Sequence, residues 1–267
     1  MIRGLYTSAS GMQTQQNKND ALANNLANVN TTGYKSKQSM IRSFPDVLIN
    51  ATRTPNGANK LIGTLNQGVF VEENVPIFLQ GDITDTGVAS HMAIYDSELN
   101  LDPENGEQPK LFFTIEDKNG DRFYTRSGMF TEDASGQLVT PEGNLVLDDW
   151  NYPIQVDGRK YSVNDKGYIR FSDGETIRFG LTSINDLSKI ENKGNEMYSY
   201  IGNEDLDYID EEENYRIYQG KIERSNVDVN QTVTDMMTAL RMYEANQNVI
   251  QSIDRTLEKA VNEIGRV

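Results

Sequence analysis

Both ends of the chain carry apolar residues at alternating steps of three and four, within residues 1–30 and 226–264. This spacing places the apolar side chains on one face of a helix. A helix with a single apolar stripe must bury it, and burial contributes roughly 25 cal/mol per Å² of apolar surface. The sequence therefore predicts that the two terminal helices pair as a coiled coil, with the rest of the chain carried between them.

The two stripes differ in their polar interruptions. The first runs through Ile2, Leu5, Ala9, Met12, Gln16, Asn19, Ala23 and Leu26, and the second through Met236, Ala239, Tyr243, Asn246, Ile250, Ile253, Leu257, Ala260 and Ile264. Small and amide side chains reduce the gain from burial, so we expect helices that are marginal alone and ordered by association. We predict a self-assembly seam formed by Ile2, Leu5, Met12, Leu22, Leu26, Met236, Tyr243, Ile250, Ile253, Leu257 and Ile264.

The stripes alone would also fit the core face of an ordinary helical hairpin. The flanks of both stripes favour association instead, because they are rich in amides where a solitary surface helix more often shows Lys and Glu. These amides are Gln13, Gln15, Gln16, Asn17, Asn19, Asn24, Asn25, Asn28, Asn246, Gln247, Asn248 and Gln251. Uncharged amide faces suit packing against further protein.

Charge is distributed unevenly along the chain. The charged residues of 1–33 are Arg3, Lys18 and Asp20, and 221–267 holds six basic and seven acidic residues, so the middle carries the whole net charge of −15. A strongly acidic body is a poor nucleic-acid binder, whereas nearly neutral ends can approach copies of themselves without strong repulsion. This zoning fits the subunit of a polymer.

Composition excludes several classes of protein. The 267 residues are enough for one or two domains, and the absence of cysteine excludes a disulfide framework. No apolar run is long enough for a membrane span, and the N-terminus lacks the apolar run of a cleaved signal peptide. Taken alone this indicates a cytoplasmic protein, unless export uses a route that needs no cleaved signal.

Turn residues divide the interior into a connector and a β domain. Gly33 is placed to end the first helix, and residues 34–80 read as an extended connector with short strands, including 68–72 and 77–79. Residues 81–220 show short strands separated by tight turns, as in an antiparallel β domain. The strongest hairpin joins 111–116 to 122–126, and Asn119-Gly120 predicts a type I′ turn.

We find no pattern that indicates enzymatic chemistry, a cofactor or a metal. His91 is the only histidine, so it is expected to be structural. The segment 8–11 lacks the leading glycine of a nucleophile elbow. The aspartates at 117 and 121 resemble a calcium loop, but the glycine is misplaced and the closing glutamate is missing. The acidic loop 203–213 is expected to be solvated, and only carboxylate-pair chemistry, as in glycosidases, stays open.

Two long blocks resemble the terminal signatures of bacterial flagellar rod and hook proteins. The first includes Asn24, Asn25, Leu26, Ala27, Asn28, Asn30, Thr31, Gly33, Tyr34 and Lys35, and the second includes Ser225, Asn226, Val227, Asp228, Tyr243, Glu244, Ala245 and Asn246. In the middle, 80–87 and 124–130 are similar to the β domain of that family. The chain length is more like that of a rod subunit than of a hook protein, and the opening of the chain and the segment 42–45 are most similar to the distal-rod type. The polar stretch 96–110 and the acidic 203–213 loop depart from the family pattern.

The resemblance implies an α+β fold. We expect a helical coiled-coil domain from 1–33 with 225–267, a connector at 34–80 and a β-rich domain at 81–220. It also implies a structural subunit of the flagellar basal body, exported without a cleaved signal peptide by the flagellar export apparatus. The expected partners are copies of itself and adjacent rod and hook proteins, in a hollow shaft that transmits motor torque to the hook. The alternative is an adhesin or binding module on a coiled-coil stalk, which would form a closed oligomer.

Overall fold

The computed structural model describes residues 2–51, 60–101, 106, 108–202, 206, 209 and 214–264. The chain divides into two compact units. The helical unit consists of Met1–Ala27, Ser36–Ile77 and Val227–Val267, and the β unit consists of Asn28–Lys35 and Phe78–Asn226. Residues 36–77, which we expected to form a connector, thus share a compact unit with both helices. Two terminal helices and a central antiparallel β region confirm the α+β class.

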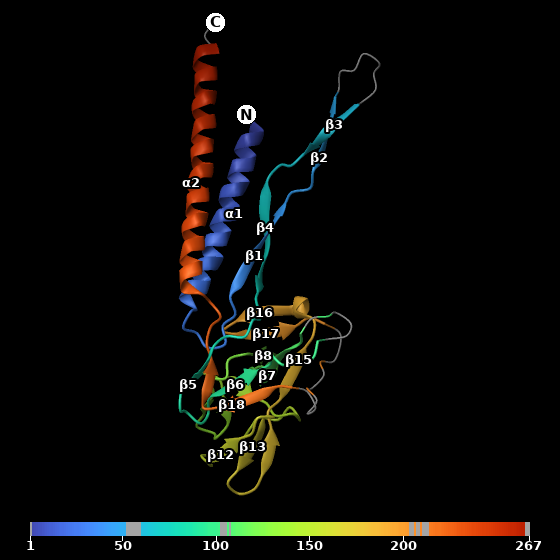
Figure 1. Cartoon of the computed structure of the whole chain (residues 1–267), viewed down its shortest axis with the longest axis vertical. Coiled ribbons are helices and arrows are strands. Elements are labelled where there is room, and N and C mark those ends of the chain that lie inside the picture. Colours follow the sequence, from blue (N-terminus) through green and yellow to red (C-terminus); the bar gives the residue numbers. More distant parts are fainter. Residues whose placement is uncertain are drawn as a thin grey trace. The chain divides into compact units, whose positions relative to one another are not determined.

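The helical unit holds two long helices and a two-stranded ribbon. Helix α1 spans Ile2–Ala27 and helix α2 spans Val229–Lys259, followed by a π-helical turn at Ala260–Ile264. Strand β1 (Lys37–Ser43) pairs antiparallel with β4 (Val69–Pro76), and β2 (Val47–Ala51) pairs with β3 (Lys60–Leu65). Figure 1 shows α1 and α2 side by side, with β1 and β4 along α1. The predicted strand at 77–79 is wrong, because β4 ends at Pro76.

The β unit is built around an eight-stranded antiparallel sheet. Its order is β16-β17-β8-β7-β11-β10-β9, and β15 also pairs with β7. These strands span Lys110–Glu116 (β7), Arg122–Thr125 (β8), Thr131–Glu132 (β9), Leu138–Val139 (β10), Leu145–Val146 (β11), Leu181–Ile184 (β15), Ile190–Gly194 (β16) and Met197–Tyr200 (β17). A single 3₁₀ turn, Leu187–Lys189, precedes β16.

Smaller sheets complete the β unit. One contains β12 (Tyr161–Val163), β13 (Tyr168–Phe171) and β14 (Thr176–Arg178), and two pairs join β6 (Met92–Tyr95) to β18 (Arg216–Gln219) and β5 (Ile83–Asp85) to β19 (Lys221–Glu223). In the pairs β6–β18 and β5–β19, a strand from near the beginning of the segment Phe78–Asn226 pairs with a strand from near its end. Most strands between them therefore pair with strands close in the sequence, whereas these two pairs join strands that are far apart in the sequence.

The predicted hairpin at 111–126 is confirmed as β7 and β8, but its turn is not type I′. Within this turn only Gly120 adopts a positive φ, of 85°. The Gly120 amide donates to the carbonyl of Asp117, and the Asp117 amide donates to the carbonyl of Asp121, each at 2.9 Å. This is a type I turn closed by a left-handed glycine, the usual geometry of a slightly longer loop. The strand pairing, Glu116 with Arg122, leaves room for that longer loop.

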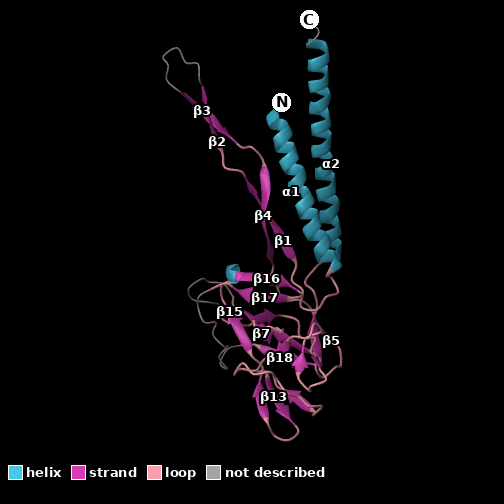
Figure 2. Ribbon diagram, turned by 180° about the vertical axis from the view of Figure 1, so that it is seen from behind, coloured by secondary structure: helices cyan, strands magenta, loops and turns pink. Residues whose placement is uncertain are grey.

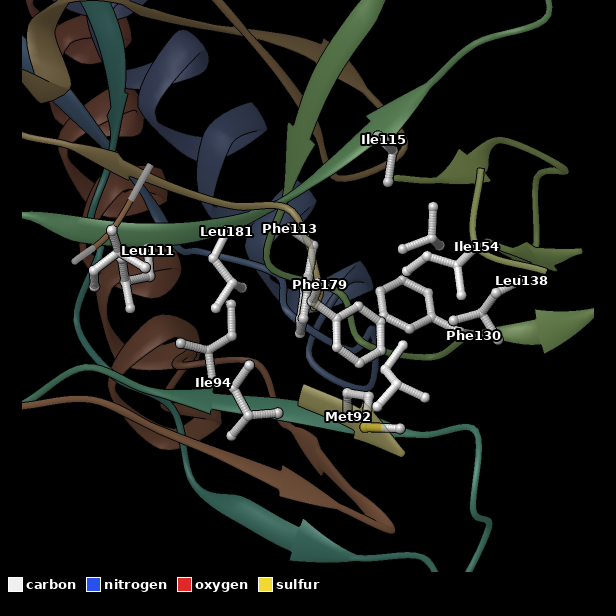
Figure 3. Packing of buried hydrophobic residues seen from close by; sticks show 14 of the residues in the cluster. Met92, Ile94, Leu111, Phe113, Ile115, Phe130, Leu138, Ile154, Phe179 and Leu181 are labelled. Atoms are coloured by element: carbon white, nitrogen blue, oxygen red, sulfur yellow. The ribbon is translucent and has the colours of Figure 1, made fainter. Parts of the chain in front are cut away.

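Strand β7 is buried on both of its faces. Leu111, Phe113 and Ile115 face one apolar cluster, where the ring centroids of Phe113 and Phe130 lie 5.0 Å apart. Figure 3 shows these side chains packed against Phe179 and Leu181. Phe112 points the other way, into a second cluster that contains Tyr198. Alternation along a strand sends neighbouring residues to opposite faces, so the continuous apolar run of β7 supplies both cores.

Candidate functional site

Helices α1 and α2 run antiparallel along a close contact (Figure 2). A Cβ atom at Gly4 would lie 3.3 Å from Cδ1 of Ile253, and one at Gly11 would lie 2.9 Å from Nδ2 of Asn246. Because a step of seven forward in α1 matches a step of seven back in α2, the helices stay in register over at least two turns. Glycine at both positions lets the backbones approach.

The predicted stripe of α2 lies on its less exposed side. Thr232 and Ala239 are buried, while Met236, Tyr243, Asn246, Ile250, Ile253, Leu257 and Ala260 are half-buried. Steps of three and four therefore repeat from 232 to 260, and they face α1 where the two glycines mark the contact. The side chains of Ile2 and Ile264 lie outside the described residues.

The predicted stripe of α1 is wrong at three positions. Leu5, Met12, Asn19, Leu22 and Leu26 are half-buried, but Ala9, Gln16 and Ala23 are exposed. Ser8 is buried and Gln15 is half-buried in their place. The reason is that α1 packs against α2 on one side and against the β1–β4 ribbon on another, so its less exposed surface is wider than a single apolar stripe.

A polar stripe on α1 binds the ribbon of the same molecule. The Thr14 hydroxyl donates to the carbonyl of Val69 at 3.1 Å, and the Ser10 hydroxyl accepts from the Val69 amide at 3.4 Å. Further along, Asn25 donates to the carbonyl of Lys37 and accepts from its amide, each at 2.8 Å. Asn25 therefore bonds the ribbon as a neighbouring strand would, whereas the amide flanks led us to expect such bonds to other protein.

The first signature block continues into the β unit. Gly33 has φ +71°, and a Cβ there would lie 2.6 Å from the backbone nitrogen of Ser127. The Gly33 amide donates to the carbonyl of Glu223 at 2.9 Å, and the Thr32 and Ser127 hydroxyls lie 3.1 Å apart. Tyr34 is buried, and burial raises its pKa to about 12. The segment 28–35 is thus an integral part of the β unit.

The second signature block begins α2. Asp228 is its N-cap, and the carboxylate accepts a hydrogen bond from the amide of Gln231 at 3.1 Å. Just before it, the side-chain amide of Asn226 donates through Nδ2 to the carbonyl of Leu79 at 3.3 Å. The remaining signature positions are placed as follows: Ser225, Val227, Leu26, Asn28 and Thr31 are half-buried, and Asn24, Ala27, Asn30, Glu244 and Ala245 are exposed.

Four buried charged side chains form a network inside the β unit, named here the junction network: Lys35, Asp96, Arg126 and Glu223. Each side chain is 1% exposed. Glu223 binds Nζ of Lys35 at 2.6 Å and Nη2 of Arg126 at 3.0 Å, and Asp96 binds Nη1 of Arg126 at 2.6 Å. Two positive and two negative charges balance, as a buried site requires.

Burial and the neighbouring charges also shift the pKa values of three members of the network. Burial by itself would raise the pKa of Asp96, but Arg126 and Lys110 outweigh that effect and hold it below its usual value. Burial and repulsion by Arg126 lower the pKa of Lys35 to about 8, although Glu223 opposes them. Burial disfavours the charge on Arg126, yet its two carboxylate partners raise its pKa. At neutral pH Lys35, Asp96 and Arg126 are therefore charged.

The described residues show no group of three or more His, Asp or Glu side chains placed to hold a metal ion. His91 lies 2.9 Å through Nδ1 from the hydroxyl of Thr86, and burial lowers its pKa. The acidic residues of the 203–213 loop lie outside the described residues. Within the described part of the chain, no helix has the length and apolar character needed to cross a membrane.

Three family descriptions match separate parts of the chain. Residues 5–35 match the flagella basal body rod protein, 109–171 the flagellar hook protein FlgE/F/G D1 domain, and 218–263 the flagellar basal body rod FlgEFG protein C-terminal region. The matches cover α1, the centre of the β unit and α2.

Whole-chain similarity is also high. The chain is 34% identical to the flagellar hook-basal body complex protein FlhO of Bacillus subtilis over 272 residues, covering all of both chains. It belongs to the flagellar rod and hook protein family. Other members include the flagellar basal-body rod protein FlgG of Borreliella burgdorferi, 31% identical over 98% of each chain, and FlgF of Caulobacter vibrioides, 30% identical over all of both chains. The family resemblance seen in the sequence is confirmed.

Sequence reasoning missed two features of this family member. The junction network joins residues from four distant segments, and no local pattern marks Asp96 or Glu223 as buried. The hydroxyl stripe of α1 carried a usable signal, because Thr7, Ser10 and Thr14 recur at helical spacing. Such a stripe predicts a polar partner along one face of the helix.

Proposed function

We propose that the chain is a structural subunit of the bacterial flagellar basal-body rod and has no enzymatic activity. It polymerises through its terminal helices into a helical tube that transmits motor torque to the hook. Family membership along the whole chain supports this role. The distal rod is the proposed position, supported by the resemblance at residues 42–45.

The observation that carries the proposal is the unburied surface of α2. Of its 31 residues only Thr232 and Ala239 are buried. Met237, Leu240, Met242 and Val249 are each about half exposed, at 56, 48, 49 and 46%. A surface helix with this much exposed apolar area lacks a partner for it. Neighbouring copies would supply one.

We infer that the paired stripes of α1 and α2 act as a coiled coil in the assembled tube, with the predicted seam as its core. Head-to-tail contacts that do not close into a ring produce open helical assemblies. The acidic charge is carried by the middle of the chain, so nearly neutral helices can meet with little repulsion. The proposed partners are copies of the chain, adjacent rod and hook proteins, and the flagellar export apparatus.

Ile253→Asp tests the seam. The change places a carboxylate on the side of α2 that faces α1, against Gly4, so assembly should fail. Electron microscopy of concentrated protein should show filaments for the natural chain and none for the variant. Gln251→Asp is the matched control, because this residue is exposed and two positions away. Small closed oligomers of the natural chain would instead support a stalked binding module.

A further inference from the structure

The backbone enters or leaves the β unit at four points: Asn28, Lys35, Phe78 and Asn226. Three of these points lie at or within a few residues of the junction network. Lys35 is a member itself, the segment 79–81 follows Phe78, and Glu223 precedes Asn226. The network therefore lies where the chain segments converge, and not in the middle of the apolar core.

Glu223 connects all three of these segments. One of its oxygens, Oε1, accepts hydrogen bonds from Nζ of Lys35 at 2.6 Å and from the amide of Gly81 at 2.8 Å. Its other oxygen, Oε2, accepts from Nε of Arg126 at 3.1 Å. Lys35 also donates to the carbonyl of Leu79 at 2.8 Å. A shift of any one segment would take a bonding partner away from the buried charge of Lys35 or Glu223.

Arg126 anchors this arrangement to the sheet. Besides its two carboxylates, it donates to the carbonyl of Leu111 at 2.7 Å and to Oε1 of Gln80 at 3.3 Å. Leu111 belongs to β7, so the guanidinium is bonded to the strand that is buried on both faces of the sheet. The amide of Leu111 reaches Asp96 at 3.3 Å, which closes the cycle of bonds.

Close backbone packing restricts the same region. A Cβ atom at Gly81 would lie 2.1 Å from the carbonyl oxygen of Arg224, and the Arg224 amide donates to the carbonyl of Asp82 at 2.8 Å. The segments that follow Phe78 and precede Asn226 therefore run in direct backbone contact. Charge pairing and steric fit act on the same few residues.

We propose that the junction network is a positioning device that holds three of the four exits of the β unit in one arrangement, so that the subunit transmits force without yielding there. The inference rests on the proposed role in torque transmission. A buried ionic network is a poor source of net stability, because desolvation offsets the attraction, but an unpaired buried charge is strongly disfavoured. Such a network therefore favours a single geometry over many similar ones.

Native-state hydrogen exchange on the full-length monomer separates positioning from general stability. The variant is Lys35→Met, and the control is Ile115→Val, which removes one methylene from the apolar core and leaves every member of the junction network in place. Lys35→Met should speed exchange of the Gly33 and Gly81 amides by about tenfold or more beyond the control, at matched global stability. Lys35→Gln keeps a donor and should lie between the natural chain and Lys35→Met, and it serves alone if Lys35→Met does not fold.

Equal exchange at these amides in the Lys35 variants and in the stability-matched control would overturn the positioning role. Swimming speed of a strain complemented with each gene gives the second measurement. If the natural chain restores motility and Lys35→Gln restores it less than Ile115→Val does, positioning is supported in the rod. If Lys35→Gln and Ile115→Val restore it equally, positioning is refuted. If the natural chain restores nothing and forms no filaments, the proposed function fails, whereas the exchange result still decides the network.

Discussion

Replacing Gly33 with alanine should destabilise the β unit more than the same change at a glycine in an open turn. Gly33 has a left-handed backbone, and a residue with a Cβ atom costs about 1–2 kcal/mol there. The added methyl group would also lie 2.6–2.8 Å from backbone atoms of Arg126 and Ser127, none of which can rotate away. Forcing a group into packed surroundings costs typically about 1–3 kcal/mol. The expected total is about 2–5 kcal/mol.

Gly87→Ala provides the matched control. Gly87 has nearly the same backbone angle, φ +68°, but nothing lies within 4 Å of the position its Cβ would occupy. The Gly87→Ala variant should therefore lose only the backbone contribution to the free energy of unfolding, about 1–2 kcal/mol. The difference between the two variants therefore isolates the contact between the segment 28–35 and the backbone at 126–127.

Urea unfolding of the full chain, followed by near-ultraviolet circular dichroism, is the assay. Buried tyrosines such as Tyr34 and Tyr198 report the β unit. The midpoint multiplied by the slope gives the free energy of unfolding of each variant. If Gly33→Ala loses no more than Gly87→Ala, the segment 28–35 is not packed against the sheet as described, and the reasoning is refuted.

Three further predictions concern the two units. Asn25→Ala should lower helical-unit stability by about 1–3 kcal/mol in thermal unfolding, because it removes the side chain that bonds two backbone groups of the ribbon, whereas Asn17→Ala at an exposed position should change it little. The pKa of Lys35 is about 8 in the folded chain and 10.5 ordinarily, so between these values the unfolded chain binds one more proton than the folded chain. In urea unfolding, the stability of the natural chain relative to Lys35→Met should therefore rise as the pH is raised from 8 to 10. A stability difference between the two proteins that does not change with pH would contradict the lowered pKa. The fragment 28–226 should melt cooperatively in calorimetry, whereas 81–220 should not, since it lacks two members of the junction network.

Local patterns predicted the elements that depend on local chemistry. The β7–β8 hairpin followed from an apolar run, a turn and a second apolar run, and only the turn type differed. The stripe of α2 was readable because that helix packs on one side, so its less exposed positions follow one heptad series from 232 to 260. The period of the hydrophobic residues is enough to predict the less exposed positions of a helix when that helix has a single packed face.

The stripe of α1 could not be read in the same way. This helix packs on two sides, and its second partner is a strand whose backbone is bound by hydroxyl and amide side chains. Ser8 and Thr14 are therefore among the most buried residues of α1, at 7 and 1% exposure. A hydrophobicity pattern assigns such residues to the exposed side. The error at Ala9, Gln16 and Ala23 follows from that rule and not from irregular helix geometry.

Three residues of the first signature block have physical roles within the molecule. Asn25 bonds the ribbon, Gly33 fits a space that admits no side chain, and Lys35 neutralises a buried carboxylate. Each of these tasks accepts one residue type, because an amide, a hydrogen atom or a reaching cation is needed at a fixed place. Other signature positions, such as Glu244 and Ala245, are exposed on α2. The first signature block therefore includes places where one molecule is held together, at the ribbon and in the junction network.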